Sequence, residues 1–357
     1  MRIHQLNSAL AYGDAITNHT FEMGKVLRKW GFDTYIFSEI MDGNKVLQKA
    51  ESDKIYKKYM NFKEDLLIFH YSVHCENANL YKNSKNIKIF EYHNITPEGY
   101  FNGYDGHTYL ICKRGRNELK SLTNCKISLG DSEYSRRELV QCGFDDKKSD
   151  VLPIFINFEK LESICVNKNI FKKFSNEFVN ILFVGRVAPN KRIEDLIKIF
   201  YIYNRFINKK SRLFIVGSRF LKKYDEQLDQ LVKHLKLNNV IFTNKVSLSD
   251  LKTYYKLANV FLCMSEHEGF CVPLIEAMHF KIPIISYSST AIPYTLKDAG
   301  ILVNKKSYAE VAELIDILVN DKNLSDRIIR KQDERLEEFD RQCVERKLLS
   351  IIEKAIT

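Results

Sequence analysis

The stretch Val179–Lys191 has the sequence VNILFVGRVAPNK, and this stretch decides the fold. Val179–Val184 is an apolar run broken only by Asn180, and it has the length of a buried β-strand. Gly185 then marks a turn, and apolar residues recur with helical spacing over Ile193–Phe200. A buried strand followed by a helix is the repeating unit of α/β proteins, in which a parallel sheet carries helices on both faces.

The same alternation of short apolar runs and helical stretches extends in both directions along the chain. The other runs that we expect to be strands are Met1–Leu6, Phe32–Phe37, Leu66–Tyr71, Ile87–Tyr92, Ile127–Leu129, Val151–Ile154, Leu213–Val216, Val240–Phe242, Val260–Cys263, Ile282–Ile285 and Ile301–Val303. The alternation lapses over Asn157–Glu177. We therefore predict an α/β protein with two Rossmann-like, doubly wound domains, residues 1–160 and 175–338.

The composition is that of a globular protein. The chain has 357 residues, of which 45% are hydrophobic and 28% charged, so disorder is excluded as its main state. No apolar run is long enough to span a membrane, and the N-terminus lacks the apolar core of a signal peptide. We expect a cytoplasmic protein. The eight cysteines include no C-x-x-C pair, which argues against a zinc site or a redox motif, so we expect free thiols.

The net charge of +10 is distributed unevenly along the chain. Residues 1–170 hold 24 Lys and Arg against 22 Asp and Glu, whereas residues 171–357 hold 31 against 23. A basic second half favours an anionic partner such as a phosphorylated ligand, although a solvated Lys-rich surface would give the same count. No helix-turn-helix, RNP or zinc-finger pattern supports a nucleic-acid partner.

The segment Ser265–Met278, with the sequence SEHEGFCVPLIEAM, carries the strongest signal for a ligand site. It follows the expected strand Val260–Cys263 and opens a helix. Glu268 lies in the strand–helix loop, and Glu276 lies in the helix, so both carboxylates can face one ligand. The backbone N–H groups at the start of the helix favour an anion. Two carboxylates beside such an anion site suit a polyhydroxylated, phosphorylated ligand better than they suit simple helix capping.

Two cations follow the strand Val179–Val184. Arg186 and Lys191 lie in the turn before the next helix, where paired cations suit a diphosphate. Two exposed loop cations are the alternative reading. Taken with Glu268 and Glu276, the pair favours a phosphorylated ligand.

Gly185-Arg186 with Lys191, followed by Glu268 and Glu276, resembles the retaining glycosyltransferases of family 4, which have the GT-B fold. The resemblance extends into the first half. Tyr12-Gly13-Asp14 is similar to that family's N-terminal glycine loop, and His93 follows a strand where the family places a sugar-contacting histidine. Gly130-Asp131-Ser132 with Arg136 is similar to the family's last strand–helix turn of the N-terminal domain. The resemblance also implies that the final helix, within 341–357, packs back on the N-terminal domain.

The resemblance implies a role for each matched position. Arg186 and Lys191 would neutralise the diphosphate of a nucleotide-sugar, Glu268 would bind hydroxyls of its sugar, and Glu276 would bind the ribose. His93 would contact the sugar near the reacting carbon. The remaining donor-binding positions would be Gly13, Asp14, Gly185, Gly217, Lys245, Val246, Gly269, Phe270, Cys271 and Val272.

Three features depart from the family's usual pattern and lie near the expected donor site. Cys271 and Asn244 stand where glycine is common, and Ser288-Ser289-Thr290 with Pro293-Tyr294 replaces a common Gly-Gly and Pro-Glu arrangement. None of these changes removes a charged candidate. They leave the nucleotide and the sugar open, with GDP-mannose or a UDP-sugar as the expected donor.

No D-x-D sequence is present to hold a divalent ion, so we expect no metal and no cofactor. Arg186, Lys191 and a helix terminus can replace the metal electrostatically. The expected reaction is a retaining transfer to a glycan or a lipid-linked acceptor in cell-surface polysaccharide biosynthesis. There are two alternatives. One is a GT-B transferase with a small soluble acceptor such as a sugar phosphate, and the other is a non-catalytic basic scaffold or nucleic-acid-binding protein.

Other signals have weaker functional readings. Glu276-x-x-His279 has the spacing of a metal motif but occurs once, so we expect His279 to be a helix-end residue. His70 and His74 can line an acceptor site, although structural histidines are the favoured reading. Basic and aromatic residues within 54–63 and 104–122 suit an anionic membrane surface, with a solvated helix face as the alternative.

Overall fold

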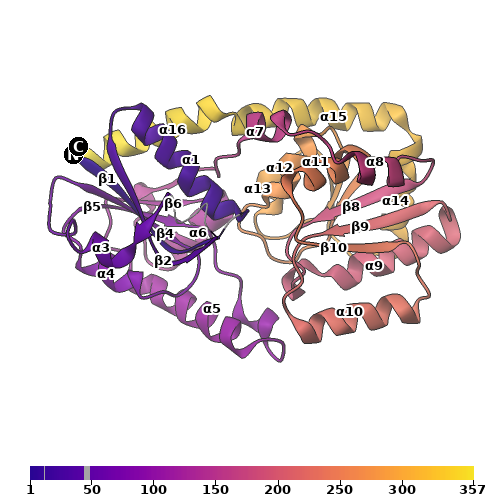
Figure 1. The fold of residues 1–357 in the computed structure, drawn as a ribbon, viewed down its shortest axis with the longest axis horizontal. Helices are drawn as coiled ribbons and strands as arrows, with labels where there is room; N and C mark the ends of the chain where they lie inside the picture. The colour runs from indigo at the N-terminus through magenta and orange to yellow at the C-terminus, as the bar shows by residue number, and fades with distance from the viewer. Residues whose placement is uncertain (12, 44–48) are drawn as a thin grey trace. The chain divides into compact units, whose positions relative to one another are not determined.

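The computed structural model describes residues 1–357 apart from Tyr12 and residues 44–48 (Figure 1). It divides into two compact units. Unit 1 comprises Met1–Gly99, Gly106–Asn157 and Glu338–Thr357. Unit 2 comprises Tyr100–Asp105 and Phe158–Glu337. The segment Tyr100–Asp105 thus groups with the second unit, although the sequence suggested that it belongs with the first.

Unit 1 contains a seven-stranded sheet in the order β3-β2-β1-β4-β5-β6-β7, and every strand pair in it is parallel. The strands are β1 (Arg2–Ala11), β2 (Asp33–Asp42), β3 (Glu51–Ser52), β4 (Leu66–Tyr71), β5 (Ile87–Tyr92), β6 (Ile127–Gly130) and β7 (Ser149–Val151). The helices are α1 (Ala15–Lys29), α3 (Asp53–Tyr56), α4 (Asn77–Asn83), α5 (Gly106–Glu118), α6 (Glu133–Gln141) and α16 (Arg341–Ile356).

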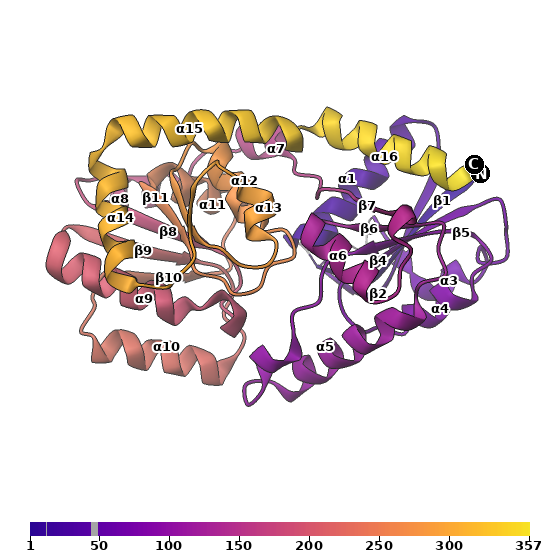
Figure 2. The same ribbon diagram turned by 180° about the vertical axis from the view of Figure 1, so that it is seen from behind.

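Helices cover both faces of this sheet, with α1 and α16 on one face and α4 and α5 on the other (Figures 1 and 2). The C-terminal helix α16 contributes Val344, Leu348 and Ile351 to the same buried cluster as Ile3 of β1 and Leu27 of α1. These side chains are at most 2% exposed. The burial of this apolar stripe explains why the last helix of the chain packs on the first unit.

Unit 2 contains a six-stranded parallel sheet in the order β10-β9-β8-β11-β12-β13. The strands are β8 (Val179–Val184), β9 (Ser211–Val216), β10 (Val240–Asn244), β11 (Val260–Cys263), β12 (Ile284–Tyr287) and β13 (Ile301–Val303). The helices are α7 (Phe158–Ser163), α8 (Lys168–Phe174), α9 (Ile193–Ile202), α10 (Lys222–His234), α11 (Leu248–Leu257), α12 (Val272–His279), α13 (Ile292–Leu296), α14 (Tyr308–Asn320) and α15 (Lys322–Leu336). In Figure 1, α9 and α10 lie on one face of the sheet, and α11 and α12 lie on the other.

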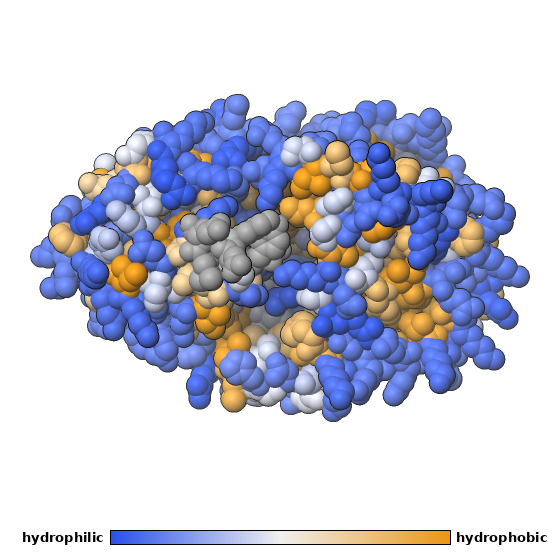
Figure 3. Space-filling model, viewed as in Figure 1, coloured by the Kyte–Doolittle hydropathy of each residue, from blue (hydrophilic) through white to orange (hydrophobic). Residues whose placement is uncertain are grey.

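The predicted fold class, two doubly wound Rossmann-like parallel sheets, is therefore confirmed. The central strands of both sheets are largely buried, and in unit 1 they also carry buried polar residues, among them Asn7 of β1, His70 of β4 and Glu91 of β5. The molecular face in Figure 3 is mostly hydrophilic, with smaller hydrophobic groups among the hydrophilic residues. Within the described residues, no helix is long and apolar enough to cross a lipid bilayer.

Several element boundaries differ from the sequence prediction for local reasons. The strand expected from Ile282 begins at Ile284, because Pro283 has no N–H for the ladder. The first strand continues beyond Leu6 to Ala11, because it stays paired with β2 as far as Ala11 opposite Asp42. The buried side chain of Asn7 in this extension accepts a hydrogen bond from the Thr20 hydroxyl at 2.9 Å.

Helical boundaries differ as well. The helix expected over Tyr104–Leu122 is α5, Gly106–Glu118, followed by a short 3₁₀ turn. Its start is delayed because the N–H groups of Tyr104 and Asp105 bond back to the carbonyl of Phe101. The stretch where the alternation lapses forms the short helices α7 and α8.

The strand order fixes where a ligand can bind in each unit. In unit 2 the chain proceeds from β8 outward in one direction and from β11 outward in the other, so the order reverses between these two strands. In unit 1 the reversal lies between β1 and β4. Ligands of doubly wound sheets bind at such reversals, beyond the carboxyl ends of the strands.

Candidate functional site

The loops after β8 and β11 meet at the strand-order reversal of unit 2. Lys191, seven residues after the end of β8, donates to Glu268 on the loop after β11, with 2.6 Å between Nζ and Oε2. The side chains are 16% and 9% exposed, respectively. Two residues chosen separately from the sequence, 77 positions apart, are thus in direct contact. A nearly buried cation and anion at this edge can engage a ligand that carries both phosphate and hydroxyl groups.

Gly185 and Gly217 follow the neighbouring strands β8 and β9, and their backbones are in close contact. A Cβ atom built on Gly217 would lie 1.9 Å from the carbonyl oxygen of Gly185. The φ angle of Gly217 is +152°, which side-chain-bearing residues rarely adopt. Only glycine at position 217 therefore allows these two turns to approach each other.

The loop that carries Glu268 is held by hydrogen bonds from neighbouring segments. The Glu268 N–H donates to the hydroxyl of Thr290 at 2.9 Å, and that hydroxyl lies 3.0 Å from the Glu268 carbonyl oxygen. Asn190 donates through Nδ2 to the carbonyl of His267 at 3.0 Å. Thr295 donates to the carbonyl of Phe270 at 2.6 Å. These contacts fix the loop conformation. The sequence analysis named Thr290 only as part of a departure from the family pattern and did not name Thr295, because nothing local connects either residue to the Glu268 loop.

Glu276 lies in α12, and the structure pairs it with a residue that the sequence did not suggest. The buried Tyr255 of α11 donates its hydroxyl to Glu276 Oε2 at 2.6 Å. Burial raises the pKa of Glu276 above its usual range, and the Tyr255 hydrogen bond opposes this rise. Tyr255 stacks on Phe280 with 5.0 Å between ring centroids, so the hydroxyl that orients the carboxylate is itself fixed.

The start of α12 has an unusual backbone. Cys271 is the N-cap residue and has a left-handed conformation with φ of 71°, and Val272 begins the helix. Asn244 and Thr290 also have positive φ angles, 57° and 44°. Left-handed backbone is unfavourable for residues with a Cβ, which explains why glycine would suit such positions. Cys271 and Asn244 are two of the positions where the sequence departs from the glycine pattern.

The sulfur of Cys271 lies beside a second buried thiol at the end of β11. The Sγ atoms of Cys263 and Cys271 and a carboxylate oxygen of Glu268 all lie within 4.8 Å of one another. Cys263 also contacts the hydroxyl of Ser265, with 3.3 Å between Sγ and Oγ. A hydrogen bond from Cys271 lowers the pKa of Cys263, whereas the same bond raises the pKa of Cys271.

The other predicted donor-binding residues of unit 2 lie near the carboxyl ends of the strands. Arg186 directly follows Gly185 and is exposed, with its guanidinium carbon 5.9 Å from the ring centroid of Phe220. Lys245 is exposed and Val246 is half-buried after β10. Gly269 and Val272 are half-buried, and Phe270 is buried.

In unit 1, the predicted glycine loop follows β1. Gly13 is exposed with φ of +85°, and Asp14 caps α1 by accepting hydrogen bonds from the N–H groups of Ile16 and Thr17, both at 3.1 Å. Asp14 therefore has a structural role that the sequence did not assign to it. Tyr12, quoted with this loop, lies outside the described residues.

His93 follows β5, and its side chain is turned into unit 1. The imidazole is 0% exposed. Its Nδ1 lies 2.9 Å from Asp131 Oδ1, and its Nε2 lies 3.0 Å from Nδ1 of His70. Both ring nitrogens are thus engaged inside the unit, and direct contact between the ring and a sugar would require one of these bonds to be exchanged.

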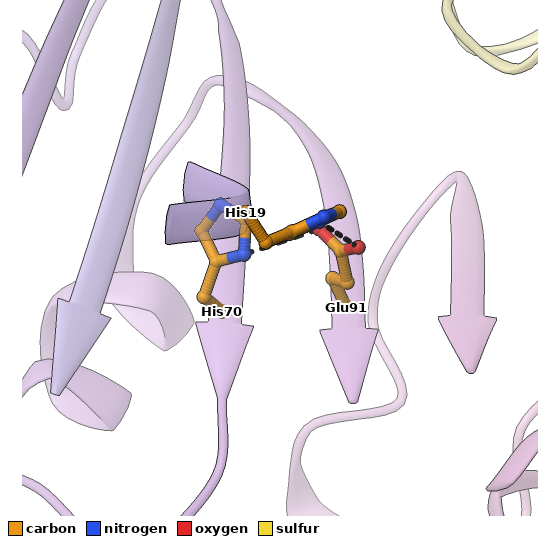
Figure 4. Close-up of side chains that lie close together, drawn as sticks. All are labelled: His19, His70 and Glu91. Atoms are coloured by element: carbon orange, nitrogen blue, oxygen red, sulfur yellow. Dashed lines mark hydrogen bonds and ion pairs between the residues drawn. The ribbon is translucent and has the colours of Figure 1, made fainter. Parts of the chain in front are cut away.

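His70 and His93 belong to a buried network that also contains His19 and Glu91. Figure 4 shows His70 on β4 and Glu91 on β5, with His19 of α1 beside them. His19 Nε2 lies 2.8 Å from Glu91 Oε1, and the His19 Nδ1 atom accepts the backbone N–H of Phe155 at 2.9 Å. Because a backbone N–H can only donate, His19 carries its proton on Nε2 and donates to Glu91.

The pKa values of His93, His70 and Glu91 are set by burial and by the charged groups beside each of them. Burial alone would lower the pKa of His93, but Asp131 and Glu91 raise it to about 9. Burial lowers the pKa of His70 to about 4. Although burial disfavours a carboxylate, the neighbouring His19 and His70 hold the pKa of Glu91 well below its usual range. The neighbouring carboxylates thus favour the protonated form of His93, in which Nδ1 donates to Asp131 and Nε2 donates to Nδ1 of His70.

His19, His70 and Glu91 have the composition of a two-histidine, one-carboxylate metal site, and their ligand atoms lie within 4.8 Å of one another. A metal on His19 Nε2 would require the proton to move to Nδ1, where it would face the Phe155 N–H. The hydrogen bonding thus suits a proton-holding network better than a metal centre.

The remaining histidine candidates have structural partners. His74 lies 2.8 Å from Glu118 through Nδ1. His279 is the last residue of α12, as expected, and its ring stacks on Phe158 with 4.4 Å between centroids. Its Nε2 lies 2.8 Å from Glu162.

Comparison with known proteins identifies what these units are similar to. Residues 167–335 match the family model described as glycosyl transferases group 1. This match covers most of unit 2, including Lys191, Glu268 and Glu276.

Two curated relatives illustrate the similarity. The chain is 30% identical over 202 residues to the capsular polysaccharide biosynthesis glycosyltransferase CapM of Staphylococcus aureus, covering 55% of this chain and 52% of CapM. It is 33% identical over 208 residues to the alpha-monoglucosyldiacylglycerol synthase of Acholeplasma laidlawii, covering 55% of this chain and 50% of the synthase. The chain thus spans about half the length of the curated relatives it matches.

Solved structures match along nearly the whole chain. The structure of HepE from Anabaena, determined in complex with UDP and glucose, has a TM-score of 0.77 and 15% identity, and covers 99% of each chain. At this identity the likeness concerns the fold, and it confirms the GT-B fold class that the sequence predicted.

Proposed function

We propose that this chain is a retaining glycosyltransferase of family 4 that transfers a sugar from a nucleotide-sugar to a glycan or lipid-linked acceptor. The observation that carries the proposal is the contact between Lys191 and Glu268 at the strand-order reversal of unit 2. It joins a phosphate-binding cation to a hydroxyl-binding carboxylate at the place where doubly wound sheets bind nucleotides. The matched family model, which spans both residues, supports the same activity.

In the proposed donor complex, the ion pair is shared with the ligand. The diphosphate accepts hydrogen bonds from Lys191 and from Arg186, whose exposed guanidinium is free to turn toward it. Glu268 accepts hydrogen bonds from hydroxyls of the sugar, and Glu276, oriented by Tyr255, accepts those of the ribose. Gly185 and Gly217 keep side chains out of the space beside the phosphates.

The proposed transfer step uses the charge of these residues. As the bond between the anomeric carbon and the diphosphate breaks, negative charge grows on the phosphate oxygens, where Arg186, Lys191 and the N–H groups at the start of α12 stabilise it. The acceptor hydroxyl attacks from the same face and gives its proton to the leaving diphosphate. The configuration at the anomeric carbon is then retained, and the cations carry out the neutralisation that a divalent metal performs in other transferases.

In unit 1, His93 acts in this proposal as a buried cation rather than as a direct ligand of the sugar. Its imidazolium is held between Asp131 and His70, so its charge is fixed before substrate arrives.

The comparisons support a class of donor and acceptor. HepE was solved with UDP-glucose, which favours a UDP-sugar over GDP-mannose as the donor to test first. CapM acts in capsular polysaccharide biosynthesis, and the Acholeplasma enzyme is named for a glucosylated diacylglycerol. We accordingly propose a role in cell-surface polysaccharide or glycolipid synthesis.

We further propose that the protein is cytoplasmic and peripheral at the inner face of the membrane. Helix α5 supports this, since Leu110 is 49% exposed and Lys113, Arg114 and Lys120 are exposed on or just after the same helix. Exposed cations beside an exposed apolar side chain suit an anionic lipid surface. Flotation with anionic vesicles tests the contact, and absence of co-flotation would refute it.

A thermal-shift series tests the donor site. UDP, GDP, ADP and their common sugar conjugates are added in the presence of EDTA. A ligand at about 100 times its Kd adds roughly 2.7 kcal/mol of stability, which corresponds to roughly 5–10 °C for a unit of this size. We expect such a shift with one nucleotide class, and its loss in Lys191→Ala. No shift with any nucleotide would contradict the proposal.

A further inference from the structure

Three potential ligand atoms converge beneath the loop that carries Glu268. They are Sγ of Cys263 at the end of β11, Sγ of Cys271 at the start of α12, and a carboxylate oxygen of Glu268 between them in sequence. Their mutual distances are at most 4.8 Å. Cys263 is 1% exposed, and Cys271 and Glu268 are each 8% exposed. The donor-binding role proposed above uses only the carboxylate and leaves the two thiols without a function.

Two sulfurs and one carboxylate form a ligand set for a thiophilic divalent cation. Tetrahedral Zn²⁺ binds thiolate sulfur at about 2.3 Å and carboxylate oxygen at about 2.0–2.2 Å, which separates neighbouring ligand atoms by roughly 3.5–3.8 Å. The present separations require adjustments of about 1 Å or less to close around such an ion. Soft sulfur ligands select Zn²⁺ and Cd²⁺ over Mg²⁺ and Ca²⁺.

The loop conformation explains how the two cysteines are brought together. The chain passes from β11 through residues 264–270 into α12, and Cys271 has a left-handed conformation as the N-cap of that helix. The hydrogen bonds from Thr290 and Thr295 to the carbonyls of Glu268 and Phe270 hold the turn. The two thiols are therefore positioned by the fold before any ion binds.

We propose that Cys263, Cys271 and Glu268 form a binding site for one Zn²⁺-like thiophilic cation, with the fourth position open to water. As the two metal–sulfur bonds form, each thiol releases its proton to solvent. The cation replaces Lys191 as the partner of Glu268. If Glu268 binds sugar hydroxyls as in the function proposed above, on which this step rests, a bound cation withdraws Glu268 from those hydroxyls and inhibits sugar transfer.

Cadmium titration in the absence of any nucleotide tests the site directly. The full-length chain, reduced with a phosphine, is titrated with CdCl₂, and the cadmium–thiolate charge-transfer absorbance is followed. We expect one saturable tight site per chain in the wild type. Cys263→Ser and Cys271→Ser should each weaken it by at least about tenfold, because each removes a ligand. Cys165→Ser is the control, since Cys165 is an exposed thiol elsewhere in unit 2.

Two further variants sharpen the result. Cys271→Gly retains the left-handed backbone and removes the sulfur, so it tests the ligand even where Cys271→Ser fails to fold. Lys191→Met removes the cation that competes for Glu268 and should tighten cadmium binding. The proposal is overturned by a wild type without a tight site, or by Cys271→Gly binding cadmium as tightly as the wild type.

The titration contains no nucleotide, so its failure leaves the proposed transferase activity untouched. Conversely, a tight cadmium site in a protein that shows no thermal shift with any nucleotide would support the metal site and contradict the transferase proposal.

Discussion

Breaking the Lys191–Glu268 ion pair should cost far more than breaking an ion pair of similar length elsewhere in unit 2. Lys191 and Glu268 lie 2.6 Å apart with side chains 16% and 9% exposed. Lys210 and Glu177 lie 2.8 Å apart with side chains 61% and 68% exposed. The two pairs have the same chemistry and differ mainly in burial, which makes the exposed pair a matched control.

The expected magnitudes follow from this difference. At 2.6 Å and an effective dielectric constant of 20, the Coulomb energy of the buried pair is roughly 6 kcal/mol before the desolvation cost is subtracted. Removing one member of a buried pair typically costs about 3–5 kcal/mol, because the other charge is left without a partner. For Lys191→Met we expect about 3 kcal/mol of lost stability, and for Lys210→Met at most about 1 kcal/mol.

The assay is a pair of double-mutant cycles read by urea unfolding. One cycle combines Lys191→Met with Glu268→Gln, and the other combines Lys210→Met with Glu177→Gln. The coupling energy should be about 2–3 kcal/mol in the first cycle and below about 1 kcal/mol in the second. Equal coupling in the two cycles would refute the claim that the Lys191–Glu268 contact is formed in a desolvated site.

Three further predictions concern other parts of the two units. Gly217→Ala should destabilise unit 2 by at least about 2 kcal/mol and abolish donor binding, because the Cβ of the alanine would lie 1.9 Å from the Gly185 carbonyl oxygen. Gly99→Ala is the control: the space around Gly99 is open, so this variant should leave the free energy of unfolding in urea unchanged. The pKa of His93 is raised from 6.5 to about 9, so folded unit 1 holds this proton more tightly than the unfolded chain does. The contribution of His93 to the free energy of unfolding is full below about pH 6.5 and is lost as the pH rises through about 9. Asp131→Asn should flatten this part of the stability–pH curve, measured by calorimetry. Leu348→Ala, at a fully buried position of α16, should lower the free energy of unfolding by about 2–5 kcal/mol. Leu349→Ala, at the neighbouring position that is 37% exposed, should change it by at most about 0.5 kcal/mol. Equal losses in the two variants would contradict the packing of this helix on unit 1.

The fold was predictable because its signals are local. Parallel strands buried on both faces are continuous apolar runs, so β4, β8 and β11 have the bounds that the sequence predicts. The turn Gly130-Asp131-Ser132, expected from the family resemblance to join a strand to a helix, does join β6 to α6, and Ser132 is the N-cap residue of that helix. The sequence did not predict a strand boundary correctly where one residue interrupts the backbone hydrogen bonding between strands, as Pro283 does before the start of β12.

The contact between Lys191 and Glu268 was predictable in part. Both residues follow strands of one sheet, and neighbouring strands bring their carboxyl ends together. The partner of Glu276 was not predictable, because Tyr255 lies on a preceding helix and no local spacing connects the two residues.

The direction in which the His93 side chain points could not be predicted from the sequence either. A histidine that follows a strand can face solvent or turn beneath the sheet edge, and the choice here depends on Asp131 and His70 from two other strand ends. The close approach of Cys263 and Cys271 could not be predicted either, because the seven residues between them do not show in sequence how the loop brings the two sulfur atoms together.

The measurement that tests the central claim most directly is the anomeric configuration of the product. The protein is incubated with UDP-glucose and, separately, with GDP-mannose in the presence of EDTA, and the released or transferred sugar is followed by proton NMR before mutarotation. The account predicts that the sugar first appears with the configuration of the donor, and that Arg186→Ala combined with Lys191→Ala abolishes turnover. First appearance of the opposite anomer, or turnover in the double variant equal to that of the wild type, would contradict it.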